Sequence, residues 1–370
     1  VRDAILGREI SDIDLATDAT PERVIALLEA AGLKAIPTGL EHGTVTAVSA
    51  GVPYEITTLR HDVETHGRRA TVAFIDDWEG DAARRDFTMN ALSLEPGGAL
   101  HDPFGGVADL RAGRVRFVGD ARQRIAEDVL RLLRFFRFHA HYGNPPPDPD
   151  ALSACREMAH MLPGLSAERV RAELLKLLGA PDPATVIVLM RDASVLEHFL
   201  PRATAIGRLA RMTAIEAGLG ANDPLRRLAA LVKLNTVGAY DLSKALRLSN
   251  AERARLVAMA SPKEALSPDL DAAARRRALY RIGVETWADR VLTAWAAGDS
   301  DTKDSGWRTL HDAGEGWTRP VFPLTGHDVK RAGVEDGAKI GERLRAVEEW
   351  WIAGDFRASR RDCLDELARR

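Results

Sequence analysis

The sequence predicts an α+β fold in which a small mixed sheet with helices precedes an all-α remainder. Strand and helix signals alternate over roughly the first hundred residues, whereas nearly every later segment shows helical periodicity between short Pro or Gly breaks. A chain of 370 residues is also too long for one compact core. We therefore expect several units joined in series.

The first unit is defined by one helix and one hairpin. Thr20 is a capping residue followed by Pro21, and Gly32 ends the pattern, so a helix is predicted over 21–31. The segments 44–49 and 52–59 are rich in β-branched and aromatic residues on either side of Ala50-Gly51, which predicts a hairpin.

The later segments are predicted to be helical. Asp120 is expected to cap one long, arginine-rich helix over 121–142, which ends before Asn144 and three prolines. A polar, glycine-containing stretch over 298–316 predicts a linker before a last helical unit. The other expected helices lie near 149–161, 166–179, 183–198, 222–235, 240–259, 269–281, 337–349 and 359–369.

Composition excludes several classes of protein. No apolar run approaches the ~20 residues of a membrane span and the start is not a signal peptide, so membrane functions are excluded. Cys155 and Cys363 are the two cysteines, which argues against a disulfide framework or a structural zinc site. A reducing, cytoplasmic setting is expected.

The charge distribution allows nucleic-acid binding despite the formal net charge of -3. Between Asp109 and Arg137 the sequence has eight arginines against four acidic residues. Binding requires basic residues on one face rather than a basic total, so this stretch is a candidate for contact with an anion. An ordinary solvated helix face is the alternative.

Two aspartates two residues apart are the candidate metal ligands. In an extended segment, Asp12 and Asp14 project to the same side. Two adjacent carboxylates need a compensating cation, and hard oxygen ligands suit Mg²⁺ better than zinc. Glu55, on the second strand of the hairpin, is expected beside them, so that three acids hold two ions. The alternatives are a surface turn for the aspartates and a salt bridge with Arg60 for Glu55.

Five motifs occur in order over about the first 140 residues, which is far more specific than any single motif. They are Val1-Arg2-Asp3-Ala4-Ile5-Leu6-Gly7-Arg8 followed by Asp12 and Asp14; Glu55-Ile56-Thr57-Thr58-Leu59-Arg60; Arg84-Arg85-Asp86-Phe87-Thr88-Met89-Asn90-Ala91; Asp102-Pro103-Phe104-Gly105-Gly106 with Asp109-Leu110; and Glu127-Asp128-Val129-Leu130-Arg131. This series resembles the class II tRNA nucleotidyltransferases, which comprise CCA-adding enzymes and bacterial poly(A) polymerases of the polymerase-β superfamily.

The resemblance implies both an activity and an organisation. The expected activity is that of a CCA tRNA nucleotidyltransferase, which adds C, C and A to the tRNA 3′ end from CTP and ATP with two Mg²⁺ ions and releases pyrophosphate. No obligate protein partner is indicated. The expected parts are a polymerase-β-like nucleotidyltransferase head at 1–118, a helical neck for base recognition at 119–180, and a helical body at 181–300 and tail at 301–370 that bind the acceptor and TΨC arms of tRNA.

The resemblance also implies roles for further residues. Arg134 and Arg137 are expected to contact phosphate, and Arg2 and Arg85 would join them. Asp86 is the candidate for the ribose 2′-hydroxyl, with pairing to a neighbouring arginine as its alternative role.

Asp128 and Arg131 are the candidates for base selection. Three positions apart on the predicted helix, they would lie on one face. A carboxylate accepts from the amino group of cytosine or adenine, while a guanidinium donates to the adjacent ring atom. Guanine and uracil carry a carbonyl oxygen in place of that amino group and would be rejected. An intrahelical salt bridge is the alternative.

Two further comparisons with the family pattern bear on activity. Family members carry a glycine pair before the position of Val1, so we expect a few more residues upstream in the complete gene product. The stretch 61–79 resembles the family's flexible loop, which favours complete CCA addition over addition of CC alone.

Two other functions are weighed against CCA addition. A poly(A) polymerase of the same family would be favoured by an arginine-rich tail and a more basic chain, which are missing here. An RNA-binding homologue without catalysis is suggested by the missing glycine pair, but the retained acidic residues argue against it. His327-Asp328 lacks a second nearby histidine for a phosphohydrolase site, and His139 and His141 are expected to be structural.

Overall fold

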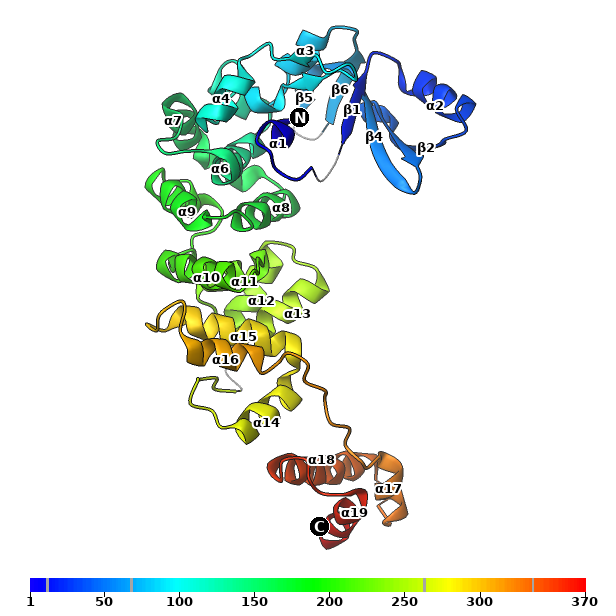
Figure 1. Ribbon diagram of the computed structural model, residues 1–370, viewed down its shortest axis with the longest axis vertical. Coiled ribbons are helices and arrows are strands. Elements are labelled where there is room, and N and C mark those ends of the chain that lie inside the picture. Colours follow the sequence, from blue (N-terminus) through cyan, green and yellow to red (C-terminus); the bar gives the residue numbers. More distant parts are fainter. Residues whose placement is uncertain (11–12, 67–68, 262–263, 335) are drawn as a thin grey trace. The chain divides into compact units, whose positions relative to one another are not determined.

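The computed structural model describes residues 1–10, 13–66, 69–261, 264–334 and 336–370, with the backbone alone for 62–66 and 69–71 (Figure 1). The chain divides into two compact units, Val1–Ile206 and Gly207–Arg370. The predicted α+β class is confirmed, because the sheets lie near the N-terminus and the rest is helical. The finer division into head, neck, body and tail stays a prediction.

A four-stranded sheet forms the start of the first unit. Its strands lie in the order β1-β4-β3-β2, with β1 parallel to β4 and the other neighbours antiparallel. The predicted hairpin is confirmed, and Ala50 and Gly51 turn it with φ of 49° and 81°, as a two-residue hairpin turn requires. The strands are β1 (Asp14–Thr17), β2 (Lys34–Gly39), β3 (Thr44–Ser49) and β4 (Val52–Thr58).

The predicted first helix is present as α2 (Pro21–Ala30), which packs against this sheet. Pro21 lies at the start of the helix and is buried together with Val24. Thr20 is the N-cap residue by position, but its side chain makes no capping hydrogen bond. The start of α2 therefore depends on the proline and on packing.

The stretch compared with a flexible loop contains a second hairpin, so a loop is the wrong description of its backbone. Strands β5 (Arg60–His66) and β6 (Arg69–Phe74) pair antiparallel, and α3 (Trp78–Ala83) follows. Backbone hydrogen bonds hold such a hairpin whatever its side chains are, so the polar composition concealed it. Two other strands, β7 (Ser93–Leu94) and β8 (Leu100–His101), form a short pair.

The predicted single helix over 121–142 is wrong at one point. Asp120 caps α5 (Ala121–Glu127) through the backbone N–H of Gln123, as expected. The chain then turns extended at Asp128, with φ −150° and ψ 105°, before α6 (Leu130–Tyr142) begins. The Asp128 carboxylate accepts the Leu130 N–H at 3.1 Å, so a local side-chain bond competes with the helix.

Aromatic residues from separate segments form the core beside this break. Phe87 packs on Phe117 and Phe138, with ring centroids 4.8 and 5.1 Å apart. Phe135 lies against Phe117 and Phe136, and all five rings are buried. Such ring pairs add to the burial of apolar area, so α6 is fixed against the segment that contains Phe87.

Among the remaining helices of the first unit, α7, α8 and α9 agree in position with the predictions, whereas α1 and α4 were not predicted. Helix α4 begins at a glycine and follows β8, and the later helices of this unit pack against α5 and α6. These helices are α1 (Arg2–Ile5), α4 (Gly106–Ala112), α7 (Pro149–Met158), α8 (Ala167–Leu178) and α9 (Pro183–Asp192), with short 3-10 turns at Leu40–His42, Thr88–Asn90, Ala159–Gly164 and Leu196–His198.

The second unit is helical throughout its described residues. Trp287 and Trp295 centre one apolar core, and Val347 and Trp351 centre another near the C-terminus. Its helices are α10 (Ile206–Gly218), α11 (Pro224–Val232), α12 (Thr236–Ala245), α13 (Asn250–Met259), α14 (Ala272–Ile282), α15 (Val284–Ala297), α16 (Ser305–Asp312), α17 (Gly326–Arg331), α18 (Gly337–Ala353) and α19 (Arg360–Arg369).

Three predictions for this unit need correction. Helices α10 and α15 were not predicted at all. The single helix expected over 240–259 is two helices, because Arg247 turns to φ 51° and Ser249 starts α13 with a capping box. The expected linker over 298–316 contains α16, which Asp304 caps and whose Trp307 and Leu310 are buried.

Charged side chains are also buried in the second unit. Glu216, fully buried, accepts from Arg226 and Arg227 at 2.8 and 2.6 Å, and Arg226 continues to Asp289. Each charge has a partner, as burial of charge requires. Along the described chain, every helix is too short or too polar to span a bilayer.

The motif that begins at Asp102 has a structural explanation. Asp102 accepts the backbone N–H groups of Gly106 and Val107 at the start of α4. A Cβ on Gly106 would lie 2.2 Å from the carbonyl oxygen of Thr88. Only glycine allows this close approach of two backbones.

We predict that Gly106→Ala lowers the free energy of unfolding by roughly 1–3 kcal/mol, because the added methyl forces two backbones apart. Gly97→Ala is the matched control, since a Cβ there would meet nothing within 4 Å. Chemical denaturation of both variants checks this, and equal stability of the two would contradict it.

Candidate active site

Asp14 and Glu55 lie side by side on neighbouring strands. The parallel pairing of β1 with β4 makes their Cα atoms register partners, and adjacent partners project to one face of a sheet. Both side chains are exposed. Among the described residues, neither carboxylate has an ion-pair partner, so two like charges are adjacent without compensation. The predicted neighbourhood is confirmed, whereas Asp12 lies outside the described residues.

The two faces of this sheet differ in chemistry. The row that contains Asp14 and Glu55 continues to Thr46 on β3. The next row contains Leu15, Ile56 and the fully buried Val45 on the opposite side. One face is therefore apolar, with Val45 buried and Leu15 at the exposed edge, and the other carries the two carboxylates beside the buried Thr46. Arg60, the alternative partner of Glu55, donates instead to the carbonyl of His42.

Three of the predicted phosphate-binding arginines surround one aromatic ring. The guanidinium carbons of Arg2, Arg134 and Arg137 lie 5.1, 5.4 and 4.3 Å from the centroid of Phe138. An aromatic face attracts each guanidinium, which offsets part of their mutual repulsion. The structure thus gathers cations from α1 and α6 into one cluster, as an anion site requires.

Asp86 belongs to the same cluster and is buried. Its Oδ2 accepts Arg134 Nε at 2.6 Å, and its Oδ1 accepts the Phe87 N–H and the Asn90 side-chain amide. The alternative role, pairing with an arginine, is therefore what the structure shows. The ribose contact of Asp86 stays a prediction. The side-chain oxygen of Asn90 also accepts a hydrogen bond from Arg2, so one amide links two of the predicted site residues, Arg2 and Asp86.

Arg85 is held next to this cluster by Asp81. Arg85 donates to Asp81 Oδ2 at 3.1 Å and to the Asn90 carbonyl at 3.1 Å, while Arg84 pairs with Asp81 Oδ1. Burial raises the pKa of Asp81, but the ion pairs with Arg84 and Arg85 outweigh it and leave this pKa below its ordinary value. Asp81 therefore stays ionised and fixes both arginines.

Asp128 and Arg131 do not share a helix face, contrary to the prediction, because α5 ends before Asp128. Asp128 pairs with Arg169 of α8 at 2.6 Å. Arg131 pairs with Glu127 at 2.6 Å and donates to the Arg84 carbonyl at 3.0 Å. Each side chain is thus held by a partner other than the expected one. Their role in base selection remains untested.

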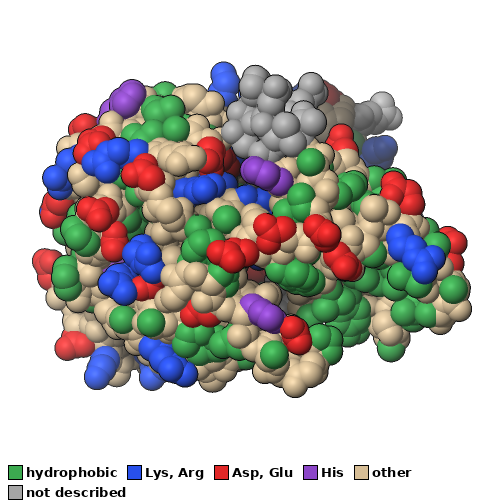
Figure 2. Space-filling view, turned by 90° about the horizontal axis from the view of Figure 1, so that it is seen from above, with side chains coloured by type: hydrophobic (Ala, Val, Ile, Leu, Met, Phe, Trp, Pro, Cys, Tyr) green, Lys and Arg blue, Asp and Glu red, His purple; other side chains and the backbone are tan. Residues whose placement is uncertain are grey.

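Most arginines of the basic stretch are paired, which favours a built site over a solvated face. Glu173 accepts from Arg137 at 2.5 Å, and Asp109, fully buried, accepts from Arg114 and Arg116. Figure 2 shows that charge is also unevenly distributed on one face of the molecule, where acidic side chains gather near the middle beside a hydrophobic area. Local charge, not the net charge of -3, decides what such surfaces bind.

Sequence analysis assigned no role to Asp81, Asn90, Phe138, Arg169 or Glu173. Asn90 lies inside the motif at 84–91, and the other signals were weaker. Phe138 follows Arg134 by four positions, so helical spacing already places an aromatic ring beside one of the arginines. Arg169 and Glu173 lie in the segment expected to form the helical neck at 119–180, which resembles the family there, but neither residue was given a role of its own.

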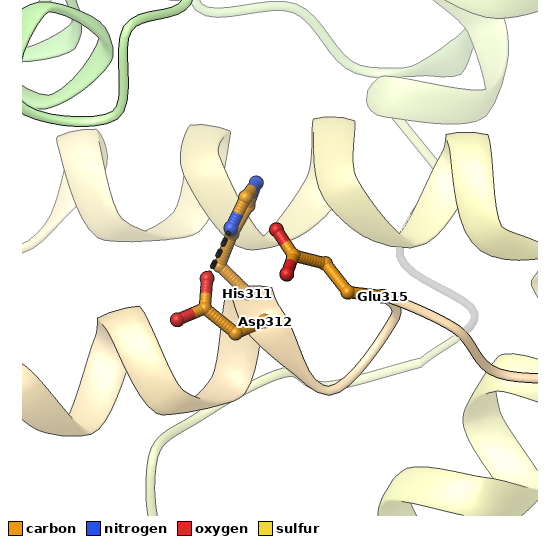
Figure 3. A group of neighbouring side chains, drawn as sticks. All are labelled: His311, Asp312 and Glu315. Carbon is orange, nitrogen blue, oxygen red and sulfur yellow. Dashed lines mark hydrogen bonds and ion pairs between the residues drawn. The ribbon is translucent and has the colours of Figure 1, made fainter.

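Two groups in the second unit contain histidine beside carboxylates, His327-Asp328 and His311-Asp312-Glu315. Asp328 caps α17 and pairs with Arg360, as expected of a residue outside a metal site. Figure 3 shows His311, Asp312 and Glu315 at the end of α16, with a hydrogen bond of 2.9 Å between the first two. These three residues come from one short segment, and two of them are exposed. Exposed acidic groups commonly lie close together without binding a metal.

Comparison with known proteins gives one consistent family. Residues 1–116 match the model of the poly A polymerase head domain, and residues 146–206 match a probable RNA and SrmB-binding site of polymerase A. The mouse mitochondrial CCA tRNA nucleotidyltransferase 1 is 34% identical over 372 residues, which are 99% of this chain and 84% of the mouse protein. The human counterpart is 33% identical with the same coverage of both chains.

Solved structures agree. The CCA-adding enzyme of Bacillus stearothermophilus in complex with CTP has a TM-score of 0.79 and 27% identity, over 100% of this chain and 91% of that enzyme. The Thermotoga maritima CCA-adding enzyme complexed with tRNA has a TM-score of 0.63 at 20% identity, over 99% of this chain and 88% of that one, which supports the fold.

We predict that the first unit loses stability as the pH falls below about 6.5, the ordinary pKa of histidine. Burial lowers the pKa of His139 and His141, and Arg137 and Arg8 lower that of His141 further against its bond to the Lys176 carbonyl. The unfolded chain therefore binds more protons than the folded one. Stability is complete above the ordinary pKa and is lost as the pH falls through the lowered values.

Urea denaturation at about pH 7.5 and 5.5 measures this loss. His141→Gln keeps a donor for the Lys176 carbonyl and should lose less stability on acidification than the parent chain. His42→Gln, at an exposed position, should behave as the parent does. An equal loss in His141→Gln and the parent would contradict the assignment.

Proposed function

The chain belongs to the class II tRNA nucleotidyltransferases, the family of the CCA-adding enzymes, and on that premise we propose that it adds C, C and A in turn to the tRNA 3′ end from CTP and ATP, releasing pyrophosphate. The observation that carries the proposal is the adjacent pair of carboxylates, Asp14 and Glu55, in the same unit as a cluster of arginines. Nucleotidyl transfer needs both features, since it acts on a triphosphate.

We propose Asp12, Asp14 and Glu55 as the ligands of two Mg²⁺ ions. The exposed, uncompensated carboxylates of Asp14 and Glu55 fit hard divalent cations. Such ions, when bound, neutralise the triphosphate and make the 3′-hydroxyl of tRNA more acidic. The strands contribute the orientation, because register pairing keeps the two carboxylates on one face.

The arginine cluster is proposed to bind the triphosphate. Arg2, Arg134 and Arg137 keep unused N–H donors while their guanidinium groups lie against Phe138. Arg85, held by Asp81, adds a fourth cation. Asp86 is proposed to accept the ribose 2′-hydroxyl, a contact that requires its pairing with Arg134 to loosen.

Asp128 and Arg131 are proposed to select the base. The carboxylate accepts from the amino group that cytosine and adenine share, and the guanidinium donates to the neighbouring ring atom. Guanine and uracil would leave the carboxylate facing an acceptor. That Asp128 lies at the break between α5 and α6 while Arg131 lies in the first turn of α6, rather than both on one helix, leaves this chemistry unchanged.

For the rest of the chain we propose tRNA binding by the helical body and tail, through the acceptor and TΨC arms. The divisions at 118, 180 and 300 are part of this proposal. A reducing compartment suits the chain because Cys155 and Cys363 are free and buried. We propose the cytoplasm, although the mammalian relatives are mitochondrial by name.

We predict that the protein with Mg²⁺, CTP and ATP extends tRNA lacking its 3′ end by three nucleotides. Resolving product lengths with each nucleotide alone and with both checks this: CTP alone should stop at two additions. Long A tails would instead support a poly(A) polymerase, and no addition would support an RNA-binding homologue without catalysis.

We predict that Asp14→Ala or Glu55→Gln reduces transfer by at least about 10³-fold, because the metal-binding pair is broken. Excess EDTA should abolish transfer by the parent chain. Glu22→Gln, at an exposed position on α2, is the control with the same loss of charge and should keep its activity. Binding of tRNA, measured by filter retention, should change by only a few-fold, and a strong loss of binding would contradict the metal role.

A further inference from the structure

The short N-terminal helix α1 is held in place by polar contacts rather than by burial. None of its four residues is buried, although it carries Arg2, one of the residues proposed to bind the triphosphate. A helix of one turn has little stability of its own, so its position depends on what it contacts. These contacts include the last turn of α6, which is far away in the sequence and close in space (Figure 1).

Tyr142, the last residue of α6, contacts three residues of this N-terminal segment. Its hydroxyl donates to Asp3 Oδ1 at 2.8 Å. The guanidinium carbons of Arg2 and Arg8 lie 4.7 and 4.8 Å from the centroid of its ring, which is stacked on that of Phe138 at 5.8 Å. An aromatic face attracts each of these cations. Burial raises the pKa of Tyr142 and outweighs the opposite effect of Arg2, so the hydroxyl remains the donor.

The bond to Tyr142 also restrains a carboxylate that competes for Arg2. Asp3 Oδ2 lies 3.8 Å from Arg2 Nη2, which is too far for a hydrogen bond. A closer carboxylate would pair with the guanidinium and occupy donors that a phosphate needs. Because Tyr142 holds Asp3 Oδ1 and attracts the guanidinium, it favours the arrangement in which Arg2 is available to an anion.

The end of α1 returns the chain to the same turn of α6. Gly7 has φ 65°, its N–H donates to the Ala4 carbonyl at 3.1 Å, and the Arg8 N–H donates to the Asp3 carbonyl at 2.9 Å. This pair of bonds ends a helix at a left-handed glycine. Arg8 Nη1 then donates to the carbonyl of His141 at 2.9 Å. Both ends of α1 are therefore attached to the last turn of α6.

Resting on the proposed binding of the triphosphate by Arg2, we propose that Tyr142 is a positioning residue for this phosphate site. Through Asp3 and through its ring, it keeps α1 against α6, so that Arg2 lies in one cluster with Arg134 and Arg137. Tyr142 acts through Arg2 and does not itself touch the nucleotide. The triphosphate of any nucleotide and the released pyrophosphate should both bind more weakly without it, whereas base choice should not change.

The first test measures KM and kcat for CTP and ATP with Mg²⁺ and tRNA lacking its 3′ end, together with inhibition by pyrophosphate. Tyr142→Phe loses the hydroxyl and should raise KM roughly threefold, whereas Tyr142→Leu also loses the ring and should raise it roughly tenfold. The inhibition constant of pyrophosphate should rise in parallel, with kcat nearly unchanged. Direct binding of CTP, measured by calorimetry, gives the same comparison without turnover. Tyr240→Phe and Tyr240→Leu, at an exposed tyrosine of α12, are the controls.

Arg2→Gln separates this inference from the proposed function. If Arg2→Gln and both Tyr142 variants raise KM and weaken pyrophosphate inhibition, the positioning role is supported. If Arg2→Gln does so while both Tyr142 variants match the Tyr240 controls, the positioning role is overturned although phosphate binding by Arg2 stands. Unchanged CTP binding and pyrophosphate inhibition in Arg2→Gln would overturn phosphate binding by Arg2 and the positioning role together.

The second test concerns the bond between Tyr142 and Asp3. If the hydroxyl acts through this bond, Tyr142→Phe should raise KM in the parent chain and have no effect in an Asp3→Ala background, because the acceptor is already missing there. An effect of the same size in both backgrounds would overturn the proposal. Thermal unfolding is measured for each variant, and a lower melting temperature with an unchanged KM would show a merely structural role and also overturn it.

Discussion

The organisation of the first unit depends on the ion pairs between Arg134 and two buried carboxylates. Asp86 approaches Arg134 from the segment before Phe87, and Glu173 approaches it from α8. Removing the carboxylates of Asp86 and Glu173 from water is unfavourable unless each is paired, so this arrangement tolerates little displacement of any of the three segments. The aromatic core of Phe87, Phe117 and Phe135 lies under the same segments and makes them rigid.

This constraint explains how one unit can carry two different chemistries. The carboxylates of Asp14 and Glu55 belong to the sheet, whose register sets their spacing. Arg134 and Arg137 belong to α6 and Asp128 to the break before it, and charge pairing and aromatic packing set the position of this segment. The proposed metal ligands and the proposed nucleotide-binding residues thus have separate structural supports. Both supports are local to the first unit, which contains all of the proposed catalytic and nucleotide-binding residues.

Patterns in the sequence predicted elements well where local chemistry decides the outcome. The hairpin around Ala50-Gly51 and the helix that begins at Pro21 were predicted because turn geometry and a fixed proline φ act over a few residues. The break at Asp128 was missed, because the helical periodicity of 121–142 continues through it while a single side-chain hydrogen bond interrupts the backbone. The pairing of β5 with β6 was missed because β5 consists almost entirely of polar residues and so lacks the strand pattern seen at 44–59.

The sequence by itself determined the family, the order of the motifs and the residue types of the site, because carboxylates, arginines and their spacing are chemical facts of the chain. Only the tertiary structure decided which of these groups meet. Asp14 and Glu55 are neighbours because two strands far apart in sequence pair in parallel. Asp128 is held by Arg169, forty-one positions away, rather than by the nearby Arg131. Such partners follow from packing and from the pairing of buried charge, which depend on the whole fold and not on spacing along the chain.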